Sequence, residues 1–170
     1  MGAVTKVAHP AVTGGLNLDY GSGGHPAGWD RFGRVIDQRW LTDGQTDVVR
    51  WQYGYDRNSN KTFADNLVLT SNKDEFHACD GLDRLSNWQR GNLNQERTGI
   101  SGTPKKEHGF GLDYLGNWPT HLQKEDGTTV LDQYRSDNPV NEVGEIAANI
   151  GDDWTDCTHD RAGNITSAPD

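Results

Sequence analysis

A five-residue pattern recurs along the chain, and it restricts the possible folds more than any other feature. The pattern consists of Asp, two variable residues, Gly, and then Arg or Asn, and full copies begin at Asp30, Asp113 and Asp160. From the composition, roughly 0.3 such matches are expected by chance. Recurrence of one short unit indicates an array of a single supersecondary structure.

Looser copies of the pattern lie between the full ones. Two begin at Asp56 and Asp80, where Ser59 and Asp83 take the place of Gly, and a sixth begins at Asn138. The six starts are separated by 22 to 33 residues. The residues that we assign to the repeat turns are Asp30, Gly33, Asp56, Asn60, Asp80, Arg84, Asp113, Gly116, Asn138, Asn141, Asp160 and Gly163.

Each unit predicts a tight turn. An Asp at the first position of a type I turn accepts a hydrogen bond from the backbone two residues later, and the fourth position needs a positive φ angle, which Gly adopts without steric cost. This is the frame of a three-residue hairpin loop with a bulge. Among the replacements, Asp83 and Asn141 tolerate a left-handed backbone moderately well and Ser59 less well. The repeat therefore predicts a series of β-hairpins.

The segments beside the turns have the pattern of half-buried strands. Bulky and polar residues alternate over 49–55, and strands are also expected over 34–40 and 85–88. Residues 142–150 are interpreted as a strand or a loop, because Gly144 weakens a helix there.

The composition favours a thin sheet. Leu, Ile, Val and Phe make up about 18% of the chain, below the ~20% at which disorder becomes a serious alternative, whereas six Trp and five Tyr argue against simple disorder. The 21 Gly and 6 Pro residues leave little room for long helices. We therefore expect an all-β fold of successive antiparallel hairpins.

The predicted organisation has two parts. Residues 1–27 are expected to form an irregular N-terminal segment or an incomplete repeat, and 28–170 to form the repeat region. After the last turn, the chain is expected to lack a second strand that would complete the hairpin. Turns are expected near positions 30, 56, 80, 113, 138 and 160.

The units at Tyr55–Asn60, Trp29–Val35 and His159–Ile165 resemble the tyrosine-aspartate (YD) repeats of the RHS repeat family. The resemblance runs from about Leu16 to Asp170. It implies that the hairpins form a strip of a spiral, single-layer shell. Such a shell encloses a C-terminal toxic polypeptide in bacterial relatives, and in the animal teneurins a similar shell supports adhesion outside the cell.

The chain also departs from the family pattern. Only Tyr55 precedes a repeat Asp as tyrosine, and only Gly33, Gly116 and Gly163 keep glycine at the turn. No segment matches the core signature that ends the shell in toxin-bearing members, or a toxin domain. These departures lead us to expect a fragment of a larger protein.

The resemblance implies a non-enzymatic structural role for the chain. The expected partners are the remainder of a larger RHS/YD-repeat polypeptide and its cargo, at the cell surface or in the secreted fraction. Residues 1–10 have neither a basic region nor an apolar region of an export signal. An isolated hairpin array of this kind is expected to be marginally stable or to associate with itself.

The six Trp residues support an alternative function. Exposed aromatic rings on a sheet stack on sugar rings, so a carbohydrate-binding or adhesion module at the cell surface, with surface glycans as partners, is the second hypothesis. In a chain with few aliphatic residues, Trp is more often packing material.

Charge and hydropathy exclude two classes of partner. The formal net charge of −9 provides no field that would attract a phosphate backbone, so we expect no nucleic-acid partner. No apolar stretch approaches the ~18 residues of a membrane span, so no membrane insertion is expected from this segment.

Motifs of catalysis and cofactor binding are missing from the sequence. The Gly-rich segments 20–24 and 99–102 contain no nucleophile elbow, phosphate-binding loop or dinucleotide fingerprint. The carboxylates show no spacing that singles out an acid–base pair. We therefore expect neither catalytic residues nor a cofactor.

Two clusters were weighed as metal sites. One is the pair of Cys/His couples, and the other is an acidic cluster that would suit Ca²⁺. Neither has the usual ligand spacing, so packing and a solvated acidic edge are the preferred interpretations, and a disulfide between the two cysteines stays open. The clusters consist of His77, Cys79, Cys157 and His159, and of Asp152, Asp153, Asp156 and Asp160.

Overall fold

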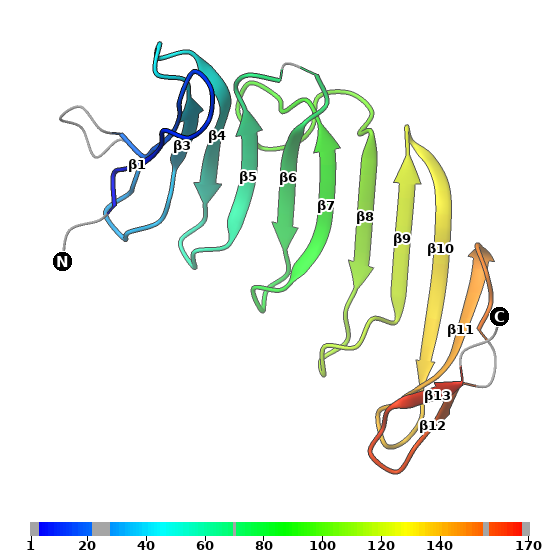
Figure 1. The fold of residues 1–170 in the computed structure, drawn as a ribbon. Coiled ribbons are helices and arrows are strands. Elements are labelled where there is room, and N and C mark those ends of the chain that lie inside the picture. The colour runs from blue at the N-terminus through cyan, green and yellow to red at the C-terminus, as the bar shows by residue number, and fades with distance from the viewer. Residues whose placement is uncertain (1–3, 22–27, 70, 155–156, 168–170) are drawn as a thin grey trace. The chain divides into compact units, whose positions relative to one another are not determined.

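The computed structural model is built entirely from strands and their connections (Figure 1). It describes residues 4–21, 28–69, 71–154 and 157–167, and none of these residues forms a helix. The all-β prediction is therefore confirmed. Among the described residues there is accordingly no helix of the length and hydropathy that crossing a membrane would require.

The strands follow one another in the sheet in the same order as in the sequence. Eleven strands, β1 to β11, form one sheet in which hydrogen-bonded neighbours are consecutive, and β12 pairs with β13 in a second, two-stranded sheet. This order is that of successive antiparallel hairpins, as predicted. The strands are β1 (Lys6–His9), β2 (Leu16–Asp19), β3 (Asp37–Leu41), β4 (Asp47–Tyr55), β5 (Lys61–Asn66), β6 (Asp74–Cys79), β7 (Leu85–Gly91), β8 (Lys106–Gly111), β9 (Thr120–Glu125), β10 (Thr128–Asp137), β11 (Val143–Ile150), β12 (Thr158–His159) and β13 (Ile165–Ser167).

The chain divides into two compact units. Unit 1 comprises Met1–His77 and Arg90–Ser101, and unit 2 comprises Ala78–Gln89 and Gly102–Asp170. In unit 1, the strand register places the rings of Trp40, Trp51 and Tyr53 on one face of β3 and β4, because directly paired residues point to the same side. Trp40 pairs with Val49, and His9 stacks on Trp40 with ring centroids 5.6 Å apart.

The opposite face of unit 1 carries ion pairs between neighbouring strands. Arg50 of β4 lies 2.6 Å from Asp37 of β3, and Arg39 lies 2.8 Å from Asp47. Arg97, in the connection that follows β7, extends over the same face of β5: it lies 2.6 Å from Asp65 and 5.2 Å from the ring centre of Phe63. This connection therefore covers part of β5.

In unit 2, β8 and β9 carry rings on one face and charged side chains on the other. Phe110 of β8 pairs with His121 of β9, and their rings are stacked with centroids 5.1 Å apart. On the other face, the register pairs Glu107 with Lys124, and Asn87 donates a hydrogen bond of 3.2 Å to Glu107. The two sides of β8 and β9 are therefore chemically different, whereas on β5 and β6 of unit 1 the rings of Phe63 and Phe76 lie on the ion-pair face.

A sheet without a second layer buries few side chains completely. Among the described residues, only Leu41, Ala64 and Ile146 are buried apolar side chains. The remaining packing comes from half-buried rings and from the hydrocarbon parts of charged side chains. The low content of aliphatic residues thus matches a fold that has almost no interior.

The structure adds to the sequence prediction at both ends. Residues 1–27 were expected to form an irregular segment or an incomplete repeat, and β1 and β2 lie there as an antiparallel pair. The loop between them closes because Gly14 and Gly15 both adopt positive φ angles, of 83° and 66°. The last hairpin was expected to lack its second strand, but β13 pairs with β12.

Leu41 provides a test of how much this thin interior contributes to stability. It is 1% exposed, so we expect Leu41→Ala to lower the free energy of unfolding by about 2–5 kcal/mol. Leu82, which is 65% exposed in a turn, is the matched control, and Leu82→Ala is expected to have little effect. Urea unfolding followed by circular dichroism measures both, and equal losses would contradict the assignment of Leu41 to the core.

Candidate functional site

The six repeat turns share one backbone hydrogen-bond pattern. In each turn the carbonyl oxygen of the first residue accepts a hydrogen bond from the N–H of the fourth, at 2.9–3.3 Å. The N–H of the first residue donates to the carbonyl oxygen of the fifth, at 2.8–3.1 Å. These two bonds close the hairpin loop that the sequence pattern describes.

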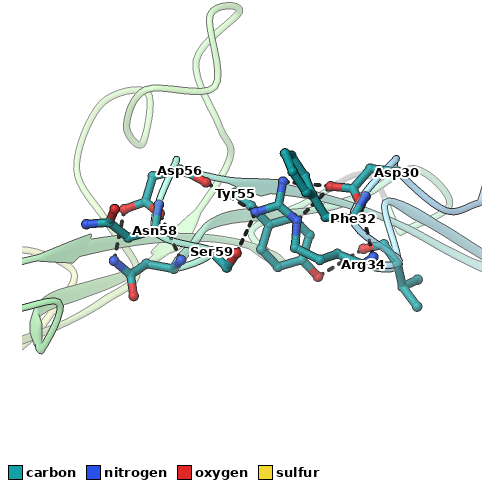
Figure 2. A network of polar contacts seen from close by, with 9 residues as sticks. Asp30, Phe32, Arg34, Tyr55, Asp56, Asn58 and Ser59 are labelled. Atoms are coloured by element: carbon teal, nitrogen blue, oxygen red, sulfur yellow. Dashed lines mark hydrogen bonds and ion pairs between the residues drawn. The ribbon is translucent and has the colours of Figure 1, made fainter.

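The side chain of the first residue binds the inside of its own turn. One side-chain oxygen accepts hydrogen bonds from the backbone N–H groups of the third and fifth residues, at 2.8–3.0 Å in every turn. In the first turn these donors are Phe32 and Arg34, which bind Asp30 (Figure 2). A carboxylate at this position thus satisfies two backbone donors that the strands leave unpaired.

The fifth residue completes the turn with its side chain. In the five turns that begin with Asp, its side-chain N–H donates to the second carboxylate oxygen at 2.6–2.9 Å. The donors are Arg34, Asn60, Arg84, Asn117 and Asn164. The requirement for Arg or Asn in the repeat is therefore a requirement for a side-chain donor. We call this contact the turn clamp.

The turn at Asn138 has the same clamp with donor and acceptor exchanged. Asn138 donates from its amide nitrogen to the Glu142 carboxylate at 2.8 Å, while its oxygen keeps the two backbone contacts. Replacement of the first residue by a donor is thus matched by replacement of the fifth by an acceptor. This exchange shows that the contact between the two side chains, rather than a negative charge at the first position, is the common element.

The backbone of the fourth residue is left-handed in all six turns. The φ angles of Gly33, Gly116 and Gly163 are 77°, 94° and 82°, and the non-glycine residues Ser59, Asp83 and Asn141 have φ angles of 74°, 62° and 66°. All twelve residues assigned to turns by the sequence therefore lie in turns of one geometry.

Neighbouring turns within unit 1 are joined by Arg34. Its guanidinium donates to the carbonyl oxygen of Asp56 at 3.2 Å and to the Ser59 hydroxyl at 3.1 Å, as Figure 2 shows. It also lies 4.6 Å from the ring centre of Tyr55, whose hydroxyl donates to the carbonyl of Val35 at 2.9 Å. The Tyr that precedes Asp56 therefore packs against the clamp of the preceding turn.

The same link between consecutive turns recurs within unit 2. Arg84 donates to the carbonyl oxygen of Asp113 at 2.5 Å. The amide groups of Asn117 and Asn141 bind each other at 2.7 and 3.3 Å. In these three turns the fifth residue therefore has two roles, because it clamps its own turn and contacts the next one.

Two further turns of this kind were missed by the sequence analysis. Thr42 and Asn94 occupy the first position, each binds the backbone of the fifth residue through its side chain, and Gln45 and Arg97 adopt φ angles of 62° and 57°. Neither turn contains the Asp or the Gly that defines the pattern. The remaining signal, Thr or Asn followed four residues later by Thr, is too common to be informative.

The clamp lowers the pKa of the repeat aspartates. For Asp56, Asp80 and Asp160, the largest cause is the hydrogen bond from the side chain of the fifth residue, to which the backbone donors add. For Asp30 and Asp113, partial desolvation acts to raise the pKa, but the same hydrogen bonds outweigh it and the pKa falls. The turn therefore prefers the ionised carboxylate.

The residues weighed as metal ligands lie in separate settings. His77 lies on β6, where burial lowers its pKa, and Cys157 donates its backbone N–H to Gly144. Cys79 and Cys157 are not joined by a disulfide. Within the ranges that the structure describes, no three His, Cys, Asp or Glu side chains group closely enough to hold a metal ion. Asp156, of the acidic cluster, lies outside the described residues.

The six Trp side chains differ in exposure. Trp118, which precedes β9, is 42% exposed, and the other five are half-buried. Trp118 contacts Phe110 with ring centroids 5.0 Å apart. One ring of the six is therefore accessible to a ligand to a substantial degree.

Comparisons of the chain with protein-family models and with curated proteins found no match.

The left-handed position can be tested with a matched pair of glycines. A Cβ at Gly33 or at Gly81 would meet no atom within 4 Å, but only Gly33 has a positive φ. We therefore expect Gly33→Ala to lower the free energy of unfolding by about 1–2 kcal/mol through backbone strain, and Gly81→Ala to have almost no effect. Equal effects in urea unfolding would show that the left-handed geometry contributes nothing.

The turn clamp also predicts a pH dependence. Because the folded-state pKa of Asp56 lies below its unfolded value of about 3.9, its contribution is present above that value and is lost as the pH falls through the folded pKa. We expect Asp56→Asn to destabilise the protein at pH 7, and the difference from wild type to shrink as the pH falls below the unfolded pKa and through the lower folded pKa of Asp56.

Urea titrations of both proteins at several pH values measure this difference. Asp152→Asn is the control, because Asp152 is exposed and belongs to no repeat turn. A loss of stability in Asp56→Asn that is the same at acidic and neutral pH would contradict a role for the carboxylate charge.

Proposed function

We propose that this chain is a non-enzymatic structural segment of an RHS/YD-repeat shell, within a larger exported or surface-attached protein that encloses or presents a C-terminal polypeptide cargo. The observation that carries this proposal is the set of six clamped turns, in three of which the fifth residue, Arg34, Arg84 or Asn117, contacts the next turn. Such contacts define an array, because each hairpin stabilises its neighbour.

The single-layer sheet supports the same proposal. Leu41, Ala64 and Ile146 are the only buried apolar side chains in the described part of the chain, so the rings on β3 and β4 and on β8 and β9 lie on faces without a thick core beneath them. A single layer with such rings on part of its surface and ion pairs elsewhere suits a boundary between an enclosed polypeptide and water.

The state of the repeat carboxylates supports a structural rather than a catalytic role. Each clamped Asp accepts two backbone hydrogen bonds and one from a side chain, and these bonds lower its pKa. A carboxylate held in its ionised form by three donors is a poor general acid, and its lone pairs are already engaged. The most regular polar groups of the chain are therefore used to close turns.

The mass of the native polypeptide tests the proposal. An antibody against this chain would be used to blot both the source cells and their medium. A band far above 18.8 kDa supports a segment of a longer shell protein. A stable band at 18.8 kDa overturns it in favour of an independent module.

The behaviour of the isolated chain gives a second test. Uncovered rings and open sheet edges are expected to make it associate with itself, so its mass by size-exclusion chromatography with light scattering should rise with concentration. A monodisperse monomer with a sharp two-state melting transition would contradict this expectation, since it would show that the segment needs no neighbours.

A further inference from the structure

Arg135 of β10 has no carboxylate partner among the described residues, unlike the other arginines on the described strands. Among the described strands, Arg39, Arg50 and Arg90 each lie 2.6–2.8 Å from a carboxylate. Arg135 has no ion pair with any described residue, and its Nε is buried without a hydrogen-bond partner. A half-buried charge is normally paired, because removing it from water is costly. The guanidinium is therefore suited to an anion that comes from outside the chain.

The unpaired arginine lies against the most exposed Trp ring. The guanidinium carbon of Arg135 is 5.2 Å from the ring centre of Trp118. Phe110 and His121 contact the same ring, with centroids 5.0 and 5.7 Å away, and hold it in place. Trp118 is nevertheless 42% exposed, so part of its surface faces solvent. The pair thus offers an aromatic surface next to a positive charge.

A cavity lies beside this pair, entirely within unit 2. It has a volume of about 280 Å³ and is lined by Gly116, Asn117, Trp118, Arg135, Asp137 and Val143. Asp137 has neither a hydrogen bond nor an ion pair with any described residue through its side chain. Trp118 also borders a neighbouring hollow of about 400 Å³. The volume suits one or two rings of a small ligand rather than a protein segment.

We propose that this cavity binds an acidic glycan through a uronic acid residue. The C–H face of the pyranose ring would lie on Trp118, its carboxylate would pair with the Arg135 guanidinium, and its hydroxyl groups would donate to Asp137. The three contacts correspond to the three chemical features of a uronic acid: an apolar ring face, a carboxylate and hydroxyl donors. The site goes beyond the shell function and does not depend on it.

Charge favours a uronic acid over an acidic peptide as the occupant. Asp137 would repel a second carboxylate, and an acidic peptide side chain offers no hydroxyl donors to compensate. The net charge of −9 also opposes a dense polyanion at long range. A short oligosaccharide with one carboxylate for each ring combines the required groups at lower charge density.

Trp fluorescence and calorimetry are used to measure the binding of a short oligogalacturonate, the probe, to the full chain. The neutral oligogalactose of equal length and a poly-glutamate peptide are the comparison ligands. We expect saturable binding of the oligogalacturonate, with affinity lowered about tenfold or more by Arg135→Gln and by Trp118→Ala. Arg161→Gln and Phe32→Ala are the controls, because both residues are exposed in other turns and neither lines the cavity, so the affinities of these variants should stay unchanged.

Several results would overturn the proposal. They are the lack of oligogalacturonate binding, equal affinity for the neutral sugar without an effect of Arg135→Gln, and binding of poly-glutamate alone, which would indicate a peptide site. Circular dichroism checks that each variant is folded. If Trp118→Ala unfolds, Trp118→Phe keeps a ring against Phe110 and should still lower the affinity, since the smaller ring covers less of the sugar.

Discussion

The hydrogen-bonded clamp between the first and fifth residues of each turn is the contact on which the rest of the structure depends. One side-chain oxygen of the first residue accepts hydrogen bonds from two backbone N–H groups. The second terminal atom of the same side chain binds the side chain of the fifth residue. Because the same contact survives with donor and acceptor exchanged at Asn138 and Glu142, geometry rather than charge is its constant feature. The clamp closes a hairpin locally, without help from an interior.

A hairpin array that closes its turns locally does not need a thick core. Only a few side chains of the described residues, such as Leu41, are buried, and the sheet is held by backbone pairing, cross-strand ion pairs and rings packed side by side. The fifth residue adds the link between turns, as Arg34 does when it reaches Asp56 and Ser59. Stability is therefore distributed along the strip, and each hairpin depends on the next.

Prediction from sequence succeeded where the signal is local. The turns at Asp30 and Asp160 were visible because Asp and Gly have strong, position-specific preferences in such turns. The turns at Thr42 and Asn94 were not predicted, because Gln45 and Arg97 adopt left-handed φ angles although neither residue type favours that conformation. For residues 1–27 an irregular segment and an incomplete repeat stayed open, since each of the two strands there has only four residues and shows little alternation.

The sequence by itself determined the all-β class, the positions of the six turns and the strands beside them, because these depend on residues within five positions of one another. Only the tertiary structure decided which distant side chains meet. Arg97 covers Phe63, and Arg135 lies against Trp118 without a carboxylate, and both contacts are set by strand register and loop path. Long-range placement of this kind follows from the pairing of whole strands, so single residues do not encode it.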